Sequence, residues 1–188
     1  MTVIYLRESA RAGYTSLGIL ADGEVKKYLV PSGAALHLCR GYELSDEEYE
    51  DISRLDEERR ALDRATSLLA ASDKSRVTLR ARLISLGFSR EVAENTVAEC
   101  IRLGYLNERR QLERLVLREA ERNLRGPKYI TRKLAAKGYP CQEIRRVIES
   151  LTERGELDFR VIFSRLAEKR GVSAPEELRA LAYKYGYR

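Results

Sequence analysis

The sequence is poor in the residues on which most metal and catalytic sites depend. It has one histidine, no tryptophan and three cysteines that form no Cys-x-x-Cys pair. Because Cys39, Cys100 and Cys141 are odd in number and widely spaced, neither a disulfide framework nor a zinc site is expected. We predict that all three are small buried hydrophobes. His37 has no second histidine as a partner, so we interpret it as a helix-surface or packing residue.

Long apolar runs are also missing. A run such as residues 3–6 is far shorter than the roughly 20 residues that cross a bilayer. The first residues, MTVIYLRESARAG, show no apolar segment followed by a small-residue cleavage site. We therefore expect a cytoplasmic protein without membrane contact.

No catalytic constellation is recognisable. The sequence lacks the phosphate-loop pattern G-x-x-x-x-G-K-[ST] and any cluster of cysteine and histidine, and its acidic residues are spread along helical faces. Aromatic residues make up only 7% of the chain and do not alternate along strands, so base stacking has little support. We expect a protein that is not an enzyme and uses neither cofactor nor metal ion.

The charge distribution is uneven. Residues 1–56 contain 6 basic and 10 acidic residues, a balance of −4, whereas residues 57–188 contain 29 and 19, a balance of +10. A basic region indicates either a polyanionic partner, a negatively charged protein groove, or simply a solvated surface rich in arginine.

The first 44 residues have strand-like patterns. Residues 14–20 and 24–30 are joined by Ala21-Asp22-Gly23, and Asp-Gly between two such runs is a strong hairpin signal. Residues 3–6 form a further expected strand. A short helix is predicted from Pro31-Ser32 to Arg40, with Ser32 as its cap and Gly41 as its stop. We expect residues 1–44 to form a small module that the helical part does not need for folding.

Helical patterns begin at Ser45, where Ser45 and Glu48 form a capping box. The helix is expected to reach about Ala71, either continuously or with a break. An internal repeat follows, because Gly87-Phe88 recurs as Gly138-Tyr139 and Gly104-Tyr105-Leu106-Asn107 recurs as Gly155-Glu156-Leu157-Asp158, both after 51 residues. Core positions shift equally, with Leu79 matching Ile130, Leu83 matching Leu134, and Cys100 matching Leu151. Tyr139 is expected to be a core or helix-stop residue.

Each unit is predicted to contain a long helix, a short helix ending at Gly-aromatic, and a third helix ending at Gly-x-Leu-Asn/Asp. A third unit begins on schedule and stops at Gly186-Tyr187-Arg188, before its third helix. The predicted fold is mainly α, with tandem three-helix repeats in an elongated curved array and a small β-containing N-terminal module. The predicted divisions are residues 1–44, 45–107 (with a lead-in helix), 108–157 and 158–188.

The second unit resembles the RecX family. Gly126-Pro127-Lys128-Tyr129-Ile130 and the following Leu134-Ala135-Ala136-Lys137-Gly138-Tyr139 are similar to the family's Gly-Pro-x-x-Ile and Leu-x-x-Lys-Gly segments. In the first unit, Ser75-Arg76 with Leu79, Leu83 and Gly87-Phe88 is similar to the corresponding family segment, with Thr78 where glutamate is common. The leader ending in Gly41-Tyr42-Glu43-Leu44-Ser45 resembles the extension of many Gram-positive members.

The resemblance implies a regulator that binds the RecA filament on DNA. It also implies modulation, mostly inhibition, of RecA ATPase, strand-exchange and coprotease activities, and hence a role in DNA recombination, repair and the SOS response. A monomer is expected, with nucleic acid contacted mainly through the filament and only weakly by the chain itself. The alternative is a direct DNA-binding helical module.

A helical wheel of residues 127–137 places Ile130 and Leu134 on the buried side, Lys128 and Arg132 opposite, and Lys133 and Lys137 at the flanks. After the repeat shift, Lys133 matches Arg82 and Arg125 matches Lys74. For each of these residues the alternative is a solvated surface charge. The residues predicted to contact RecA or DNA are Lys74, Arg76, Arg82, Arg125, Lys128, Arg132, Lys133 and Lys137.

Overall fold

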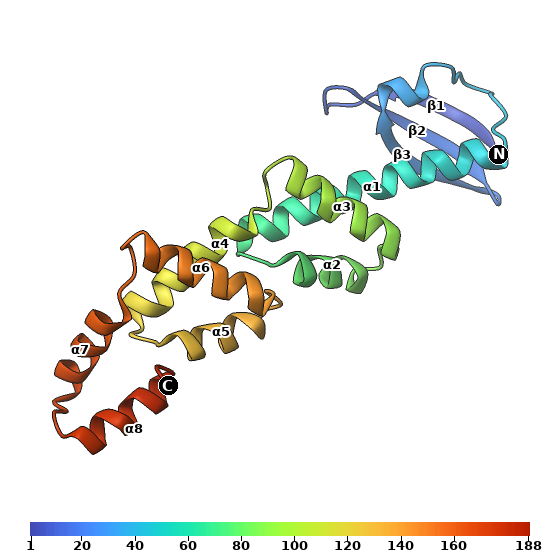
Figure 1. Cartoon of the computed structure of the whole chain (residues 1–188). Helices are drawn as coiled ribbons and strands as arrows, with labels where there is room; N and C mark the ends of the chain where they lie inside the picture. Colours follow the sequence, from blue (N-terminus) through green and yellow to red (C-terminus); the bar gives the residue numbers. More distant parts are fainter. The chain divides into compact units, whose positions relative to one another are not determined.

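A computed structural model describes all 188 residues of the chain. Three strands are followed by eight α-helices, so the fold is mainly helical with a small N-terminal sheet, as predicted (Figure 1). The residues fall into two compact units, one made of Met1–Leu68 with Arg82–Leu103 and the other of Leu69–Ala81 with Gly104–Arg188. Even the longest helix lacks the apolar stretch that a bilayer crossing needs, and no other helix has one.

The first unit begins with an antiparallel sheet in the order β1-β2-β3, formed by Thr2–Glu8, Tyr14–Ala21 and Glu24–Pro31. The predicted hairpin is present: Ala21 pairs with Glu24, and Asp22 and Gly23 take φ values of 54° and 80° between them. Positive φ at both central residues is the turn geometry that fits the twist of two antiparallel strands.

The segment after β3 differs from the prediction. A 3₁₀ helix, η1, covers only Ser32–Ala35, and the Ser32 hydroxyl accepts a hydrogen bond from Thr15 instead of capping the helix. The predicted helix to Arg40 is therefore wrong. The physical reason is the free edge of β1: Gly41 donates to the Val3 carbonyl, and Val3 donates to the Tyr42 carbonyl. Pairing of an open strand edge outweighs a weak local helical preference.

His37 is a surface and packing residue, as predicted, since it is exposed and its ring centroid lies 5.9 Å from that of Tyr42. It lies beyond η1 and not on a helix, however, with its Nε2 3.5 Å from Glu48 Oε1. A correction is needed for two of the cysteines. Cys39 and Cys141 are exposed, and only Cys100 is buried as predicted. Cys141 is the first residue of a helix and Cys39 lies in the loop beside β1, so neither occupies a position that faces a core.

Helix α1 spans Asp46–Ala71 without a break. Its capping box is present, because Glu48 N donates to Ser45 Oγ and Ser45 N donates to Glu48 Oε2. Ile52 of α1 is buried in the same core as Val3, Leu17, Ile19 and Val30 of the sheet. This core crosses the division predicted at residue 44, because Ile52 belongs to the lead-in helix. That the helical part folds without residues 1–44 stays a prediction.

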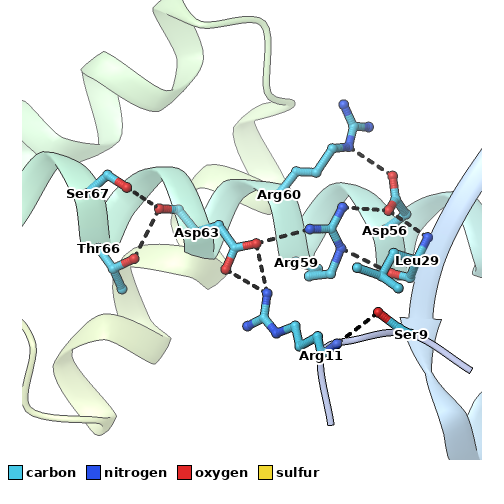
Figure 2. A network of polar contacts seen from close by, with 9 residues as sticks. All are labelled: Ser9, Arg11, Leu29, Asp56, Arg59, Arg60, Asp63, Thr66 and Ser67. Atoms are coloured by element: carbon cyan, nitrogen blue, oxygen red, sulfur yellow. Dashed lines mark hydrogen bonds and ion pairs between the residues drawn. The ribbon is translucent and has the colours of Figure 1, made fainter. Parts of the chain in front are cut away.

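Polar contacts join α1 to the sheet as well (Figure 2). Asp56 is buried and accepts hydrogen bonds from Leu29 N at 3.0 Å, Arg59 Nη2 at 2.8 Å and Arg60 Nε at 2.9 Å. Arg59 Nε in turn donates to the Leu29 carbonyl oxygen, and Arg11 Nη1 donates to Asp63. One carboxylate and one guanidinium of the helix therefore bind the backbone of Leu29 in β3.

The repeats follow the predicted order of helices. The first consists of α1, α2 (Arg76–Ser85) and α3 (Arg90–Arg102). The second consists of α4 (Glu108–Leu117), which continues as the π-helical turn η2 (Arg118–Arg122), then α5 (Pro127–Ala135) and α6 (Cys141–Glu153). The third contains α7 (Phe159–Arg170) and α8 (Pro175–Tyr185).

The signals that delimit these helices act as predicted. Asn107 and Asp158 accept hydrogen bonds from the first turns of α4 and α7. Gly138 and Gly186 take φ values of 84° and 81°, a left-handed conformation that favours glycine, at the ends of the second helices of two repeats. The repeat read from the sequence is thus a structural repeat.

The second unit has one apolar core, to which every helix from α4 to α8 contributes. Ile130 and Leu134 are buried, as the helical wheel predicted, together with Ile144 and Leu151 of α6. Tyr139 is buried too and donates from its hydroxyl to Gln111 Oε1 at 3.0 Å. Burial raises the pKa of Tyr139 to about 12. Its expected role as a core residue is confirmed.

Candidate functional site

The strongest candidate surface lies on α5 in the second unit. Gly126 precedes the helix in an extended conformation and Pro127 is its first residue, where proline fits because its missing N–H has no helical partner. Ile130 and Leu134 then fix one face in the core. Lys128 and Arg132, four residues apart, lie exposed on the opposite side, and neither forms an ion pair. We call these two residues the α5 basic face.

Lys133 has a different environment. Its Nζ lies 2.8 Å from both carboxylate oxygens of Glu119, which is only 2% exposed and also accepts from Asn123. Burial raises the pKa of Glu119, but hydrogen bonds from Lys133 and Asn123 outweigh this effect, so the pKa of Glu119 is lowered overall. The Lys133 ammonium is therefore occupied within the fold.

Arg125 is also engaged inside the unit. Its guanidinium carbon lies 4.3 Å from the ring centroid of Tyr129 and 4.6 Å from that of Tyr185. Such cation–π contacts are most favourable when the cation is partly desolvated, and Arg125 is half-buried. Nearby, Gly126 N donates to the Tyr185 carbonyl and Lys128 N donates to the Gly186 carbonyl. Arg125 thus fastens the end of α8 to the start of α5.

The predicted residues around the start of α2 have local partners. Arg76 donates from its backbone N to Glu108 Oε1 at 2.6 Å and from Nε to Oε2 at 2.5 Å. Lys74 Nζ donates to Ser72 Oγ at 2.6 Å. The Lys137 carbonyl accepts from Ser75 Oγ at 3.1 Å, while its side chain is exposed. Arg82 is exposed and contacts only Ser85 of its own helix, at 3.5 Å.

Lys133 and Arg82 therefore occupy corresponding positions in the two repeats, but their side chains have different partners. The residue that corresponds to Glu119 after a shift of 51 is Leu68, so the first repeat has no acid at that place. Sequence reasoning missed Glu119, although a signal was present. Glu119 lies three and four residues after the core positions Val116 and Leu115, which places it on the buried side of the helix.

No group of three metal-ligating side chains occurs in the structure. The arrangement instead offers positively charged groups fixed on a rigid helix. Such groups can bind phosphates or carboxylates without a catalytic step, and arginine in particular can form two parallel hydrogen bonds to either group.

Comparisons with known proteins lead to one family. No family model matches the chain. Two curated proteins, each named "Regulatory protein RecX", come from Listeria monocytogenes serotype 4a (strain HCC23) and serovar 1/2a (strain ATCC BAA-679 / EGD-e). Both are 25% identical to the chain over 125 residues, which are 66% of the chain and 46% of each relative. The match thus spans less than half of the relatives' length.

The fold agrees with a solved structure described as "Crystal structure of regulatory protein RecX". The TM-score is 0.72, with 16% sequence identity, and the match covers 99% of the chain and 92% of the solved one.

Proposed function

We propose that this chain, a RecX family protein by its sequence and its fold, binds RecA filaments assembled on DNA and modulates RecA, mainly by inhibition. The affected activities are ATP hydrolysis, strand exchange and coprotease function. The chain acts in the cytoplasm as a monomer, by binding alone, without a cofactor or a catalytic side chain. The RecA partner follows from the family resemblance of the repeat motifs.

The observation that carries the proposal is the α5 basic face. Lys128 and Arg132 are exposed and have no acidic partner, although 34% of the residues in this chain are charged and many neighbouring bases form ion pairs. The core contacts of Ile130 and Leu134 hold the helix rigidly beneath them. Of the two cations, Arg132 makes a cation–π contact, with its guanidinium carbon 5.7 Å from the Tyr129 ring centroid. Two cations without ion pairs on a fixed helix are suited to a negatively charged surface, because no internal ion pair must be broken before they bind.

The filament offers two negatively charged components, phosphate groups and acidic protein side chains. Direct binding to DNA remains the second candidate function, because the same two cations could contact phosphates alone. The two cases differ in how strongly the chain binds bare DNA near physiological salt. Each phosphate contact steepens the dependence of log affinity on log salt by about 0.7 on a single strand. Bare DNA binding should therefore be weak and steeply salt-dependent if the filament is the real target.

The test is RecA-dependent ATP hydrolysis on single-stranded DNA, measured with increasing amounts of this protein. We expect hydrolysis to fall in a saturable manner at protein concentrations comparable to that of RecA. Unchanged hydrolysis over that range, with the protein shown to be folded by circular dichroism, would contradict the proposal. Tight binding to the same DNA without RecA would favour the second candidate.

A further inference from the structure

The third repeat carries an open groove between α7 and α8, with a volume of about 350 Å³. Phe159, Phe163, Leu178 and Tyr187 provide its apolar lining, and Arg160 and Arg179 lie at its sides. Tyr187 is held by contacts within the unit, since its ring centroid lies 4.9 Å from that of Phe163 and its hydroxyl donates to the Leu124 carbonyl at 3.2 Å. The groove is therefore a built feature of the repeat.

The second repeat shows what this groove is shaped to hold. Phe163 corresponds to Leu112 after a shift of 51, and Leu178 and Ala182 correspond to Ile130 and Leu134 after a shift of 48. Leu112, Ile130 and Leu134 are all buried in one core with the apolar side of α6. That side consists of Ile144, Val147 and Leu151. The corresponding groove of the third repeat thus has the surface on which one amphipathic helix packs.

The charge around the groove identifies the kind of helix. Arg160 corresponds to Arg109, whose Nε lies 3.8 Å from Glu113 Oε1, but Ser164 stands where Glu113 would be. Arg179 corresponds to Thr131, a neutral residue. Arg160 and Arg179 are both exposed and form no ion pair. At this groove the third repeat therefore has two arginines without ion pairs. The corresponding residues of the second repeat are an ion-paired arginine and a neutral threonine.

A second copy of this chain fits the groove poorly. A two-fold contact that uses this patch on both copies would bring two sets of Arg160 and Arg179 close together. Like charges opposed across an interface weaken binding strongly. An acidic partner, in contrast, is attracted by Arg160 and Arg179.

We propose that this groove binds an amphipathic helix of a partner protein, with acidic residues beside its apolar stripe. The apolar stripe replaces the contacts that α6 makes in the second repeat, and the acids pair with Arg160 and Arg179. This inference is independent of RecA and can be tested without it.

The probe is a peptide with the sequence of α6, residues 141–153, held helical by a side-chain staple and labelled at Cys141. A stapled form is needed because so short a helix is marginal in water. A second peptide carries Arg145→Glu and Ser150→Glu, which places one acid on each side of the apolar stripe of Ile144, Val147 and Leu151 while the stripe stays unchanged. Binding of each peptide to the full chain is followed by fluorescence anisotropy.

We expect the acidic peptide to bind about tenfold or more tightly than the unmodified one at low salt, with the difference shrinking as salt rises. The chain variant Arg160→Glu/Arg179→Glu should reverse this order and keep its fold, because both residues are exposed. Leu178→Asp should abolish binding of both peptides. Val161→Asp is the matched control, since Val161 is 55% exposed on the other side of α7, and it should bind as the unmodified chain does.

Equal binding of the two peptides, or an unchanged order in the double arginine variant, would overturn the proposal. So would a dimer of the chain in sedimentation velocity that Leu178→Asp dissociates, because the groove would then serve a second copy.

Discussion

Lys133 and Glu119, 14 residues apart in the sequence, form an ion pair in which the carboxylate is buried and the ammonium side chain remains 36% exposed. Removal of the lysine leaves a buried carboxylate with Asn123 as its remaining side-chain donor. We predict that Lys133→Ala lowers the free energy of unfolding by about 1–3 kcal/mol. Lys128→Ala, on the same helix without an ion pair, should change it by no more than about 0.5 kcal/mol. Urea denaturation at pH 7 measures both values. Equally small changes for the two variants would contradict a stabilising role of the Lys133–Glu119 ion pair.

The same pair predicts a dependence on pH. The pKa of Glu119 is lowered from 4.5 in the folded chain, so the unfolded chain takes up the proton first as the pH falls. The stabilisation is therefore complete above about pH 4.5 and is lost as the pH falls through the lower folded pKa. The stability difference between the unmodified chain and Glu119→Gln should be constant from pH 7 to about pH 5 and shrink below. A difference that grows toward acid pH would show that the sign is wrong.

Gly138 packs closely on the preceding repeat. It has a φ of 84°, and a Cβ added to it would lie 2.7 Å from Ser75 Oγ, whereas at Gly155, with a φ of 71°, no atom lies within 4 Å. Alanine in this conformation costs about 1–2 kcal/mol at either site. We predict that Gly138→Ala destabilises the chain by at least about 1 kcal/mol more than Gly155→Ala. In a Ser75→Gly background this excess should become smaller, with Thr78 Cγ2 at 3.2 Å as the remaining close neighbour, and additive effects in the double-mutant cycle would refute the contact with Ser75.

Asp56 connects α1 to the sheet. Because it accepts the Leu29 N–H and two arginine hydrogen bonds while buried, we predict that Asp56→Ala lowers the free energy of unfolding by about 1–3 kcal/mol (Figure 2). Asp51→Ala is the control, since Asp51 is exposed and pairs only with Arg54, and it should have little effect. Thermal unfolding followed by circular dichroism distinguishes the two. Similar melting curves would mean that the sheet is held by apolar contacts alone.

Much of the fold was predictable because its signals are local. The Asp22-Gly23 turn, the Ser45 and Glu48 capping box and the glycine stops each act within a few residues, and the repeat shift located the core positions Ile130 and Leu134. The helix predicted to Arg40 failed because residues 41–44 pair with the edge of β1, about 40 residues earlier. That contact cannot be read from a local pattern.

The candidate site was less predictable for the same reason. The wheel placed Lys128 and Arg132 on the exposed side correctly, because that assignment depends only on helix geometry. The occupation of Lys133 depends on Glu119 in another helix, and that of Arg125 depends on Tyr185, 60 residues later. Charge counts alone do not distinguish free cations from paired ones.

The α5 basic face predicts a separation between binding and folding. We expect Lys128→Glu/Arg132→Glu to raise the concentration for half-inhibition of RecA ATP hydrolysis by about tenfold or more, because like charges across an interface cost several kcal/mol. The fold should be preserved. Arg145→Glu/Arg165→Glu changes the net charge equally at exposed residues without ion pairs and should inhibit as the unmodified chain does. If only this second variant lost inhibition, the contact with RecA would lie near Arg145 and Arg165 and not on the α5 basic face.

The most direct measurement is co-sedimentation of the chain with RecA filaments assembled on single-stranded DNA, beside the same DNA without RecA, over a range of salt concentrations. The account predicts saturable binding to the filament near physiological salt, and binding to bare DNA that is weak and falls steeply as salt rises. Absence of the chain from the filament pellet, or equal binding to bare DNA at every salt concentration, would contradict it.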